Sequence, residues 1–207
     1  MSMSRISLLL LAALAMPAVM LHAEAPNTEP EPQAQSTAGQ FLVATPDMGN
    51  SGFSHAVILM IHHDQNGAMG VVVNRPVATH PLAEIMDWIG EKHDGVTGEV
   101  RVFAGGPVEE RIGFVLHSSE YQRPETVPVG PGVSLTSSAG ILRDMGQGKG
   151  PNKALVAFGY AGWAPKQLEG EMGQNFWVTA PLDAKLIFDT DPDQVWDKAW
   201  ARRTLNL

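Results

Sequence analysis

The sequence predicts an α+β domain that follows an N-terminal export signal. Short apolar runs of strand length are interspersed with segments of helical periodicity, and turn-forming residues separate them. The chain has 207 residues, of which 44% are hydrophobic, and these values suit one globular domain with an appendage.

The composition excludes several classes of chemistry. The chain has no cysteine, so disulfide scaffolds, thiolate metal sites, Fe–S ligation, thiol catalysis and cysteine lipidation are excluded. Its formal net charge is −8, whereas nucleic acids and anionic lipids are bound by clustered Lys and Arg. We therefore expect no nucleic-acid partner, and no sequence pattern indicates a cofactor.

The N-terminus has the order of a secretory signal peptide. Arg5 precedes an apolar segment at 6–21, and small residues follow it. We expect cleavage after Ala23 or, alternatively, after Ala25. An uncleaved membrane anchor would need about 20 consecutive apolar residues, which Pro17 and the short run disfavour.

The predicted organisation is a signal peptide at 1–23, a disordered linker at 24–38 and a folded domain at 39–207. The linker segment has no large apolar side chain, so it cannot bury enough surface to offset its conformational entropy. After signal cleavage, no membrane span is expected. The predicted location is periplasmic or secreted.

Three apolar runs of strand length begin the domain, at 39–45, 56–61 and 68–74. The second and third are expected to form a β-hairpin whose turn is set by Asn66-Gly67, a dipeptide that tolerates positive φ. Both strands are apolar on successive residues, which predicts that both of their faces are covered.

The middle of the domain mixes helices and strands. Apolar residues at helical spacing predict a helix at 81–89, and Ser137 and Ser138 are candidate caps for another at 139–145. Further apolar runs predict strands at 101–104, 112–117 and 154–160.

The C-terminal part carries helix signals at two places. Pro165 stands at a possible first helical position, which predicts a helix at 166–172. Asp191 as N-cap, followed by Pro192, predicts the last helix. Short strands are expected at 177–178 and 185–188.

The histidines and serines are weak indicators of catalysis or metal binding. His62 and His63 are adjacent at a strand end, so their side chains point to opposite faces and do not easily share one ion. Ser118 lies beside His117, but the chain lacks the Gly-x-Ser-x-Gly motif, and a catalytic triad is defined by geometry. We expect no metal site and favour a protein that is not an enzyme; a hydrolase using His63 or His117 is an alternative.

Adjacent glycines such as those of Gly105-Gly106-Pro107 occur in phosphate-binding loops, but this segment lacks the Gly-Lys-Ser/Thr ending of that motif. A tight turn with close backbone approach is the better explanation.

The most unusual segment runs from Tyr160 to Trp163 and continues to Gln167 and Glu169. Two large amphipathic aromatic residues just past a buried strand suit a cleft with the carboxylates of Glu169 and Glu171 at its rim. The alternative is that Trp163 fills the end of the core while Tyr160 hydrogen-bonds to backbone.

The order of these segments resembles the YqgE/AlgH family of small bacterial proteins, over essentially residues 39–200. The segments that carry the resemblance are Gly-Gln-Phe-Leu-Val-Ala-Thr-Pro at 39–46, Phe53, His-Asp-Gln-Asn-Gly-Ala-Met-Gly-Val-Val-Val-Asn-Arg-Pro at 63–76, Gly-Gly-Pro-Val at 105–108, Gly-Phe-Val-Leu-His-Ser at 113–118, Gly-Tyr-Ala-Gly-Trp at 159–163, Gln-Leu-Glu at 167–169, Trp177 and Ala-Pro at 180–181.

The resemblance implies an α+β fold in which a bifurcated, mostly antiparallel β-sheet curls into a pseudo-barrel with flanking helices. It implies no settled activity, and the family's regulator label comes from an association with exopolysaccharide production. The chain departs from the family pattern at 50–52, at Lys166 and at Val195. Most members look cytoplasmic, which is the alternative location and the one that a transcriptional regulator would need.

We expect a non-enzymatic domain that binds an unknown protein or small molecule. The predicted binding cleft lies between the 63–74 hairpin, the Gly105–Gly106 turn and the 160–169 segment, because loops at strand ends carry function on a rigid scaffold. Its candidate residues are His63, Asn66, Asn74, Gly105, Gly106, His117, Tyr160, Trp163, Gln167 and Glu169.

Overall fold

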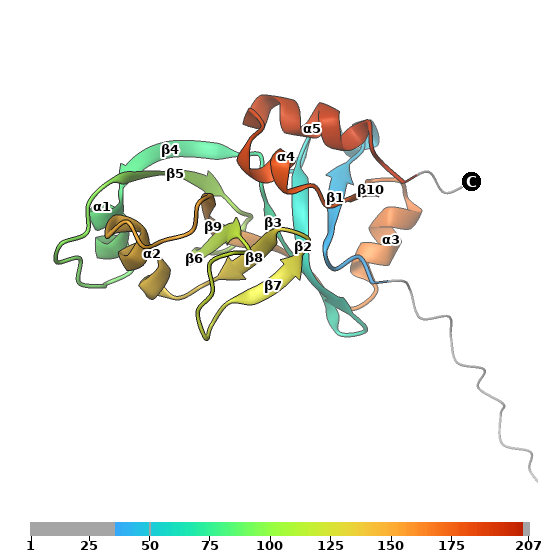
Figure 1. Ribbon diagram of the computed structural model, residues 1–207. Helices are drawn as coiled ribbons and strands as arrows, with labels where there is room; N and C mark the ends of the chain where they lie inside the picture. Colours follow the sequence, from blue (N-terminus) through green and yellow to red (C-terminus); the bar gives the residue numbers. More distant parts are fainter. Residues whose placement is uncertain (1–35, 50, 205–207) are drawn as a thin grey trace, which may run out of the picture. The chain divides into compact units, whose positions relative to one another are not determined.

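A curled ten-stranded sheet forms the domain in the computed structural model, which describes residues 36–49 and 51–204 (Figure 1). Eight strands follow one another in the order β10-β1-β2-β3-β9-β6-β8-β7, and all their pairings are antiparallel. In this order the strands are Trp177–Pro181, Gln40–Ala44, Val57–Asp64, Gly67–Val72, Ala154–Trp163, Val108–Ser118, Val133–Thr136 and Val127–Gly130.

The sheet forks along β9. Its first half pairs in parallel with β5, Glu99–Ala104, whereas its last residues pair with β3. β5 in turn pairs with β4, Pro76–Pro81. At the fork a Cβ on Gly106 would lie 2.1 Å from the carbonyl carbon of Tyr160, so only glycine fits. The expected tight turn is thus a place where two backbones touch, and the sheet is bifurcated as the resemblance implied.

The opposite ends of the sheet approach each other, which gives the curl. A Cβ on Gly39, just before β1, would lie 2.9 Å from the carbonyl oxygen of Val129 in β7. The largest hydrophobic core therefore combines residues of β1, such as Phe41, with residues of β6 and β8, such as Leu116 and Leu135. Together with the helices described next, these features make the domain α+β with a half-barrel sheet.

Helices cover the sheet in three places (Figure 1). α4, Ala184–Phe188, and α5, Pro192–Trp200, close the largest core. α1, Leu82–Trp88, and α2, Ala139–Gly146, share a second core with β5, β6 and β9. α3, Gln167–Gly173, buries Leu168 in a third core; a short 3-10 helix, Pro46–Met48, follows β1.

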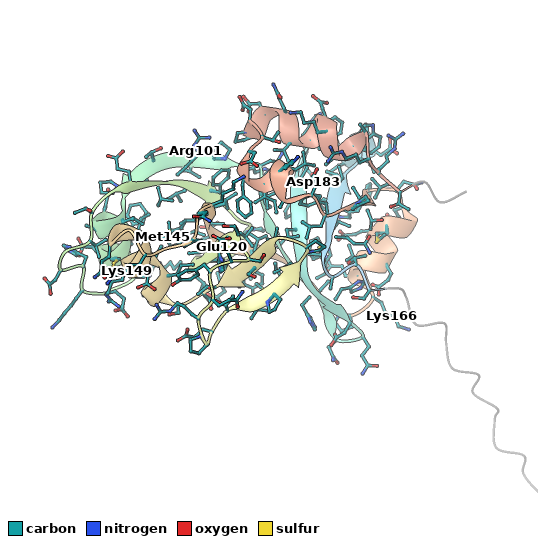
Figure 2. All side chains as sticks on the ribbon, in the orientation of Figure 1. Arg101, Glu120, Met145, Lys149, Lys166 and Asp183 are labelled. Atoms are coloured by element: carbon teal, nitrogen blue, oxygen red, sulfur yellow. The ribbon has the colours of Figure 1, made fainter. Side chains whose placement is uncertain are left out.

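Two predictions in the C-terminal part are wrong. The expected strand at 185–188 is helix α4, because Asp183, labelled in Figure 2, caps it through the amide of Lys185. The expected Pro165 helix start is also wrong: Lys166 has φ 64° and serves as the N-cap, so α3 begins at Gln167. The N-cap at Asp191 is confirmed, since its carboxylate accepts a hydrogen bond from the amide of Asp193.

The described part of the chain includes residues before the predicted start of the domain. Thr37 is only 4% exposed, and its amide donates to His63 Nδ1 at 3.1 Å, while the hydroxyl of Ser36 donates to the His63 carbonyl. Residues 36–38 of the expected linker are thus held against β2. The expected signal peptide and linker residues 24–35 lie outside the described residues.

Candidate functional site

The predicted cleft residues fall into separate local groups, which we take in turn. His63 is buried at the end of β2, and its ring is fixed from both sides. Because the Thr37 amide donates to Nδ1, the ring proton lies on Nε2 and points to the Glu169 carboxylate 3.3 Å away. His62 is exposed on the opposite face, as the alternation of a strand predicts.

Trp163 belongs to a sealed cluster, by which we mean Trp163, Trp177, Glu171 and Gln167. Trp163 is 7% exposed, and its ring meets that of Trp177 edge to face with centroids 6.0 Å apart. Both indole N–H groups donate to the same Glu171 oxygen, at 2.9 and 2.8 Å, and the Gln167 side-chain amide donates to the other oxygen at 2.9 Å. Both indole N–H groups and both carboxylate oxygens of Glu171 are thereby paired within the protein, while Gln167 is exposed on the outer side of the cluster.

The two asparagines of the predicted cleft, Asn66 and Asn74, form hydrogen bonds within the β2–β3 hairpin and to the turn before it. Asn74 accepts from the amide of Val57 and donates to the carbonyl of His55, both at 2.9 Å, which holds the start of β2 beside the end of β3. Asn66 lies at the exposed hairpin tip, where its amide donates to Asp64. The positive φ in this turn falls on Gly67, at 130°, and not on Asn66.

His117 is fully buried between β6 and β8. Its Nε2 lies 2.9 Å from the Thr136 hydroxyl and its Nδ1 lies 3.0 Å from the Ser118 carbonyl, so the Nδ1–H tautomer satisfies both contacts. Burial lowers the pKa of His117, an effect that the Ser118 carbonyl and Glu120 partly offset. The Ser118 hydroxyl donates to Glu120, labelled in Figure 2, so the adjacent Ser and His do not form a nucleophile–base pair.

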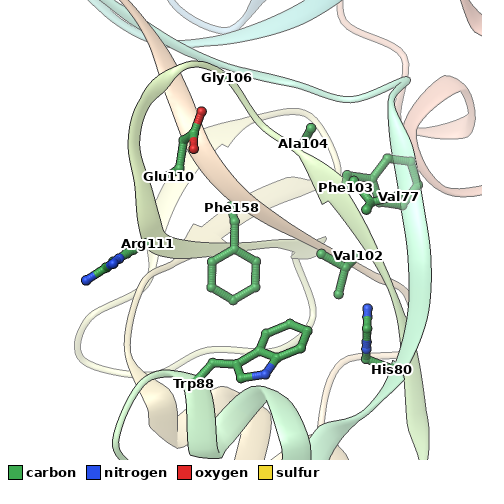
Figure 3. A pocket seen from close by; sticks show the side chains of 10 residues that line it. All are labelled: Val77, His80, Trp88, Val102, Phe103, Ala104, Gly106, Glu110, Arg111 and Phe158. Atoms are coloured by element: carbon green, nitrogen blue, oxygen red, sulfur yellow. The ribbon is translucent and has the colours of Figure 1, made fainter.

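A second set of aromatic residues lines an open pocket beside the fork, which we call the fork pocket (Figure 3). It has a volume of about 660 Å³ and mixes apolar, aromatic and charged side chains. Its lining residues are Val77, His80, Trp88, Val102, Phe103, Ala104, Gly106, Glu110, Arg111 and Phe158. Of the predicted cleft residues only Gly106 lines this pocket.

The pocket exists because the helices cover only part of one sheet face. α1 and α2 pack on Val102 and Val156, which are paired in the sheet. Two residues further along the same face are Phe158, which packs only partly buried against this core, and Ala104, which is exposed. Across from them, β6 loses its register with β9 between Val108 and Gly113, so residues 109–112 leave the ladder and form one wall.

The rim of the fork pocket carries exposed apolar side chains. Trp88 at the end of α1 is 50% exposed and meets Phe158 and His80 edge to face, with centroids 6.1 and 4.6 Å apart. Val77 on β4 is 66% exposed, and Ile112 lies 44% exposed on the bulged wall, in a smaller adjoining pocket that also contains Phe158. Two of the four large hydrophobic residues that the described chain exposes thus line the fork pocket, and a third, Ile112, lines the adjoining pocket.

Sequence reasoning missed this pocket. Trp88 falls within the helix predicted at 81–89 and Phe158 within the strand predicted at 154–160, and neither is among the predicted cleft residues. The helical spacing itself is one signal: Leu82, Ile85 and Met86 form the buried face of α1, and Trp88 falls outside that set.

Metal and nucleophile chemistry have little geometric support in the described part of the chain. No cluster of three His, Cys, Asp or Glu side chains there could hold a metal ion. Ser54 Oγ lies 3.0 Å from His55 Nδ1, but the two residues are neighbours in a turn and neither lines the fork pocket. No described helix is long and apolar enough to cross a membrane.

Comparison with known proteins identifies the family of this chain. The family model described as AlgH-like matches residues 41–207. The chain belongs to the AlgH-like family. A UPF0301 protein of Methylococcus capsulatus is 41% identical over 88% of this chain and 99% of its own length. A UPF0301 protein of Xanthomonas campestris is 44% identical over 82% of this chain and 90% of its own.

Solved structures agree with the fold. The solution structure of the AlgH protein from Pseudomonas aeruginosa matches with a TM-score of 0.68 and 35% identity, over 82% of this chain and 91% of that one. A crystal structure of the Corynebacterium diphtheriae protein DIP2367 matches with a TM-score of 0.64 at 19% identity, over 84% of this chain and 91% of its own, and supports the fold alone. The family is thus established, and these relatives carry no assigned activity in their names.

Proposed function

We propose that this AlgH-like protein is a non-enzymatic ligand-binding domain and that the fork pocket is its binding site. The single observation that carries the proposal is the 660 Å³ pocket at the fork, around which exposed apolar side chains gather. Small-molecule sites are typically concave, apolar and about 300–1,000 Å³ in volume, with a few polar groups at defined positions.

The contrast with the predicted cleft supports this choice. Trp163 and His63 are buried and their polar atoms are engaged by protein partners, whereas Trp88 presents half of its surface to solvent. Large exposed apolar groups gathered in one place are a usual mark of an interaction site. The predicted cleft stays a prediction, with Gly106 shared between it and the fork pocket.

We further propose that the protein is exported, on the strength of the basic, apolar and small-residue order at its N-terminus. Fractionation of cells expressing the intact chain tests this directly. Recovery in the periplasmic or secreted fraction, with loss of about 23 residues, supports export. Recovery of the full-length chain in the cytoplasm would overturn it and restore the regulator hypothesis.

The binding proposal is tested by filling the pocket. Ala104 is exposed on the pocket floor, so Ala104→Leu occupies the space without disturbing a buried residue. Ala78 is exposed on neighbouring β4 outside the pocket, and Ala78→Leu is the matched control. The probe is phenylpropanol, a neutral molecule with one aromatic ring, and its binding is followed by calorimetry and by the indole N–H resonances.

Saturable binding by the wild-type and Ala78→Leu proteins, with loss in Ala104→Leu, is the expected result. Equal binding by all three proteins would place the probe elsewhere and overturn the assignment of the pocket.

A further inference from the structure

We propose that the fork pocket selects an organic ammonium cation attached to an apolar or aromatic body. This inference rests on the proposed function, since it names the ligand class for the same pocket. It is carried by two features of the lining: the carboxylate of Glu110, which has no partner among the described residues, and the aromatic rings of Trp88 and Phe158 (Figure 3).

Glu110 is the acidic group of the pocket. It lies on the bulged segment of β6, exposed, and no described residue forms an ion pair or hydrogen bond with its carboxylate. In Figure 3 the carboxylate lies at the Gly106 end of the pocket, with the Phe158 ring between it and Trp88. A carboxylate beside an apolar surface is the complement of an ammonium group whose body lies on that surface.

The aromatic rings add a second attraction for positive charge. The π faces of Trp and Phe carry partial negative charge, and a cation within about 6 Å of a ring centroid is stabilised. The rings of Trp88 and Phe158 are inclined at 67°, so they form two non-parallel walls of the same cavity. Tryptophan is the strongest cation–π partner among the side chains.

The two basic side chains in the lining, Arg111 and His80, are compatible with an ammonium ligand. The guanidinium of Arg111 points away from the two rings, toward the outside of the pocket (Figure 3). The imidazole of His80 is held by Glu84, whose carboxylate oxygen lies 3.3 Å from Nδ1. The carboxylate of Glu110 is the one acidic group in the lining, and the guanidinium of Arg111 is directed away from the two rings.

Three probes that share a phenylpropyl group and differ in the head group distinguish the effect of charge from that of shape: phenylpropylammonium, phenylpropanol and 4-phenylbutyrate. Each is titrated by calorimetry into the full chain at low and high salt. We expect the ammonium to bind about fivefold more tightly than the alcohol at low salt, and the carboxylate more weakly than both. The preference for the ammonium should shrink as salt rises.

Two neighbouring substitutions provide the matched control. Glu110→Gln is expected to weaken ammonium binding by about two- to fivefold and to leave alcohol binding unchanged. Glu109→Gln removes the same charge from the next residue, which does not line the pocket, and should change neither. Arg111→Gln, which removes the opposite charge, should leave ammonium binding equal or tighter.

The outcomes distinguish this inference from the proposed function. Equal binding of ammonium and alcohol, or equal effects of Glu110→Gln and Glu109→Gln, would overturn the cation preference while leaving the pocket a binding site. Tighter binding of the carboxylate, lost in Arg111→Gln, would overturn it in favour of an anionic ligand. Binding of none of the three probes would overturn both proposals.

Discussion

Two regions of this protein combine tryptophan with a carboxylate, and they differ in whether these side chains are buried and paired with each other. In the sealed cluster, Glu171 accepts hydrogen bonds from the indoles of Trp163 and Trp177, and both rings are buried. In the fork pocket, Trp88 is half exposed and Glu110 has no partner among the described residues. Aromatic and acidic side chains form a candidate site only where the fold leaves them unsatisfied.

The largest expected difference between the two regions is in the effect on stability of replacing one tryptophan in each. Trp163→Ala should lower the free energy of unfolding by about 3–5 kcal/mol, because it leaves a large cavity and frees Glu171 from one donor. Trp88→Ala should cost about 1 kcal/mol or less, because half of the ring is already exposed. Urea denaturation followed by circular dichroism measures both; similar costs would contradict the division into a sealed and an open region.

The fork itself gives the next largest expected effect. Gly106→Ala should lower the free energy of unfolding by about 2–3 kcal/mol, since the new Cβ collides with the backbone of Tyr160. Gly170→Ala in α3, where a Cβ meets nothing within 4 Å, is the control and should be neutral or slightly stabilising. If Gly106→Ala keeps full stability, the close approach at the fork is not a structural requirement.

The two carboxylates give a smaller and equally direct contrast. Glu171→Ala should cost about 1–3 kcal/mol in unfolding free energy, because two indole donors lose their acceptor. Glu110→Ala should change stability by about 0.5 kcal/mol or less, as for most surface substitutions. Chemical denaturation of the pair of variants decides the point, and a large cost for Glu110→Ala would show that its carboxylate has a structural role.

The buried His117 is expected to make the stability of the fold depend on pH. Burial lowers its pKa below the ordinary value of about 6.5, so as pH falls the unfolded chain takes up a proton before the folded one does. Its contribution to stability is therefore constant above about pH 6.5 and falls as the pH drops below that value. His117→Asn should flatten this acid-side slope in denaturation measured at several pH values. An unchanged slope would assign the acid sensitivity to other groups.

The sequence predicts most of the central fold and little of its periphery. Strands β1, β2, β3, β5, β6 and β9 coincide with apolar runs, since residues buried on successive positions leave a clear pattern. β4 is exposed and bounded by prolines, and β7 and β8 are four residues each, so none of the three carries that pattern. The apolar run at 185–188 suits a strand or a helix equally, and its cap at Asp183 decided for the helix.

The candidate site was harder to predict for a physical reason. The segment around Trp163 stands out in the sequence because aromatic and polar residues lie close along the chain, yet that closeness lets them pair with one another. The fork pocket instead gathers β4, β5, α1, β6 and β9, and it depends on a register shift in β6. Trp88 and Glu110 line the same pocket only through that tertiary arrangement.

One titration tests most directly whether a ligand binds in the fork pocket and not at the sealed cluster. Phenylpropylammonium is added to the full chain while the indole N–H resonances are followed by NMR, with Trp88→Phe used to assign the Trp88 signal. We predict a saturable shift of the Trp88 signal with the Trp163 and Trp177 signals unmoved. Shifts at Trp163 and Trp177 with Trp88 unmoved would contradict the account and favour the cleft predicted from the sequence.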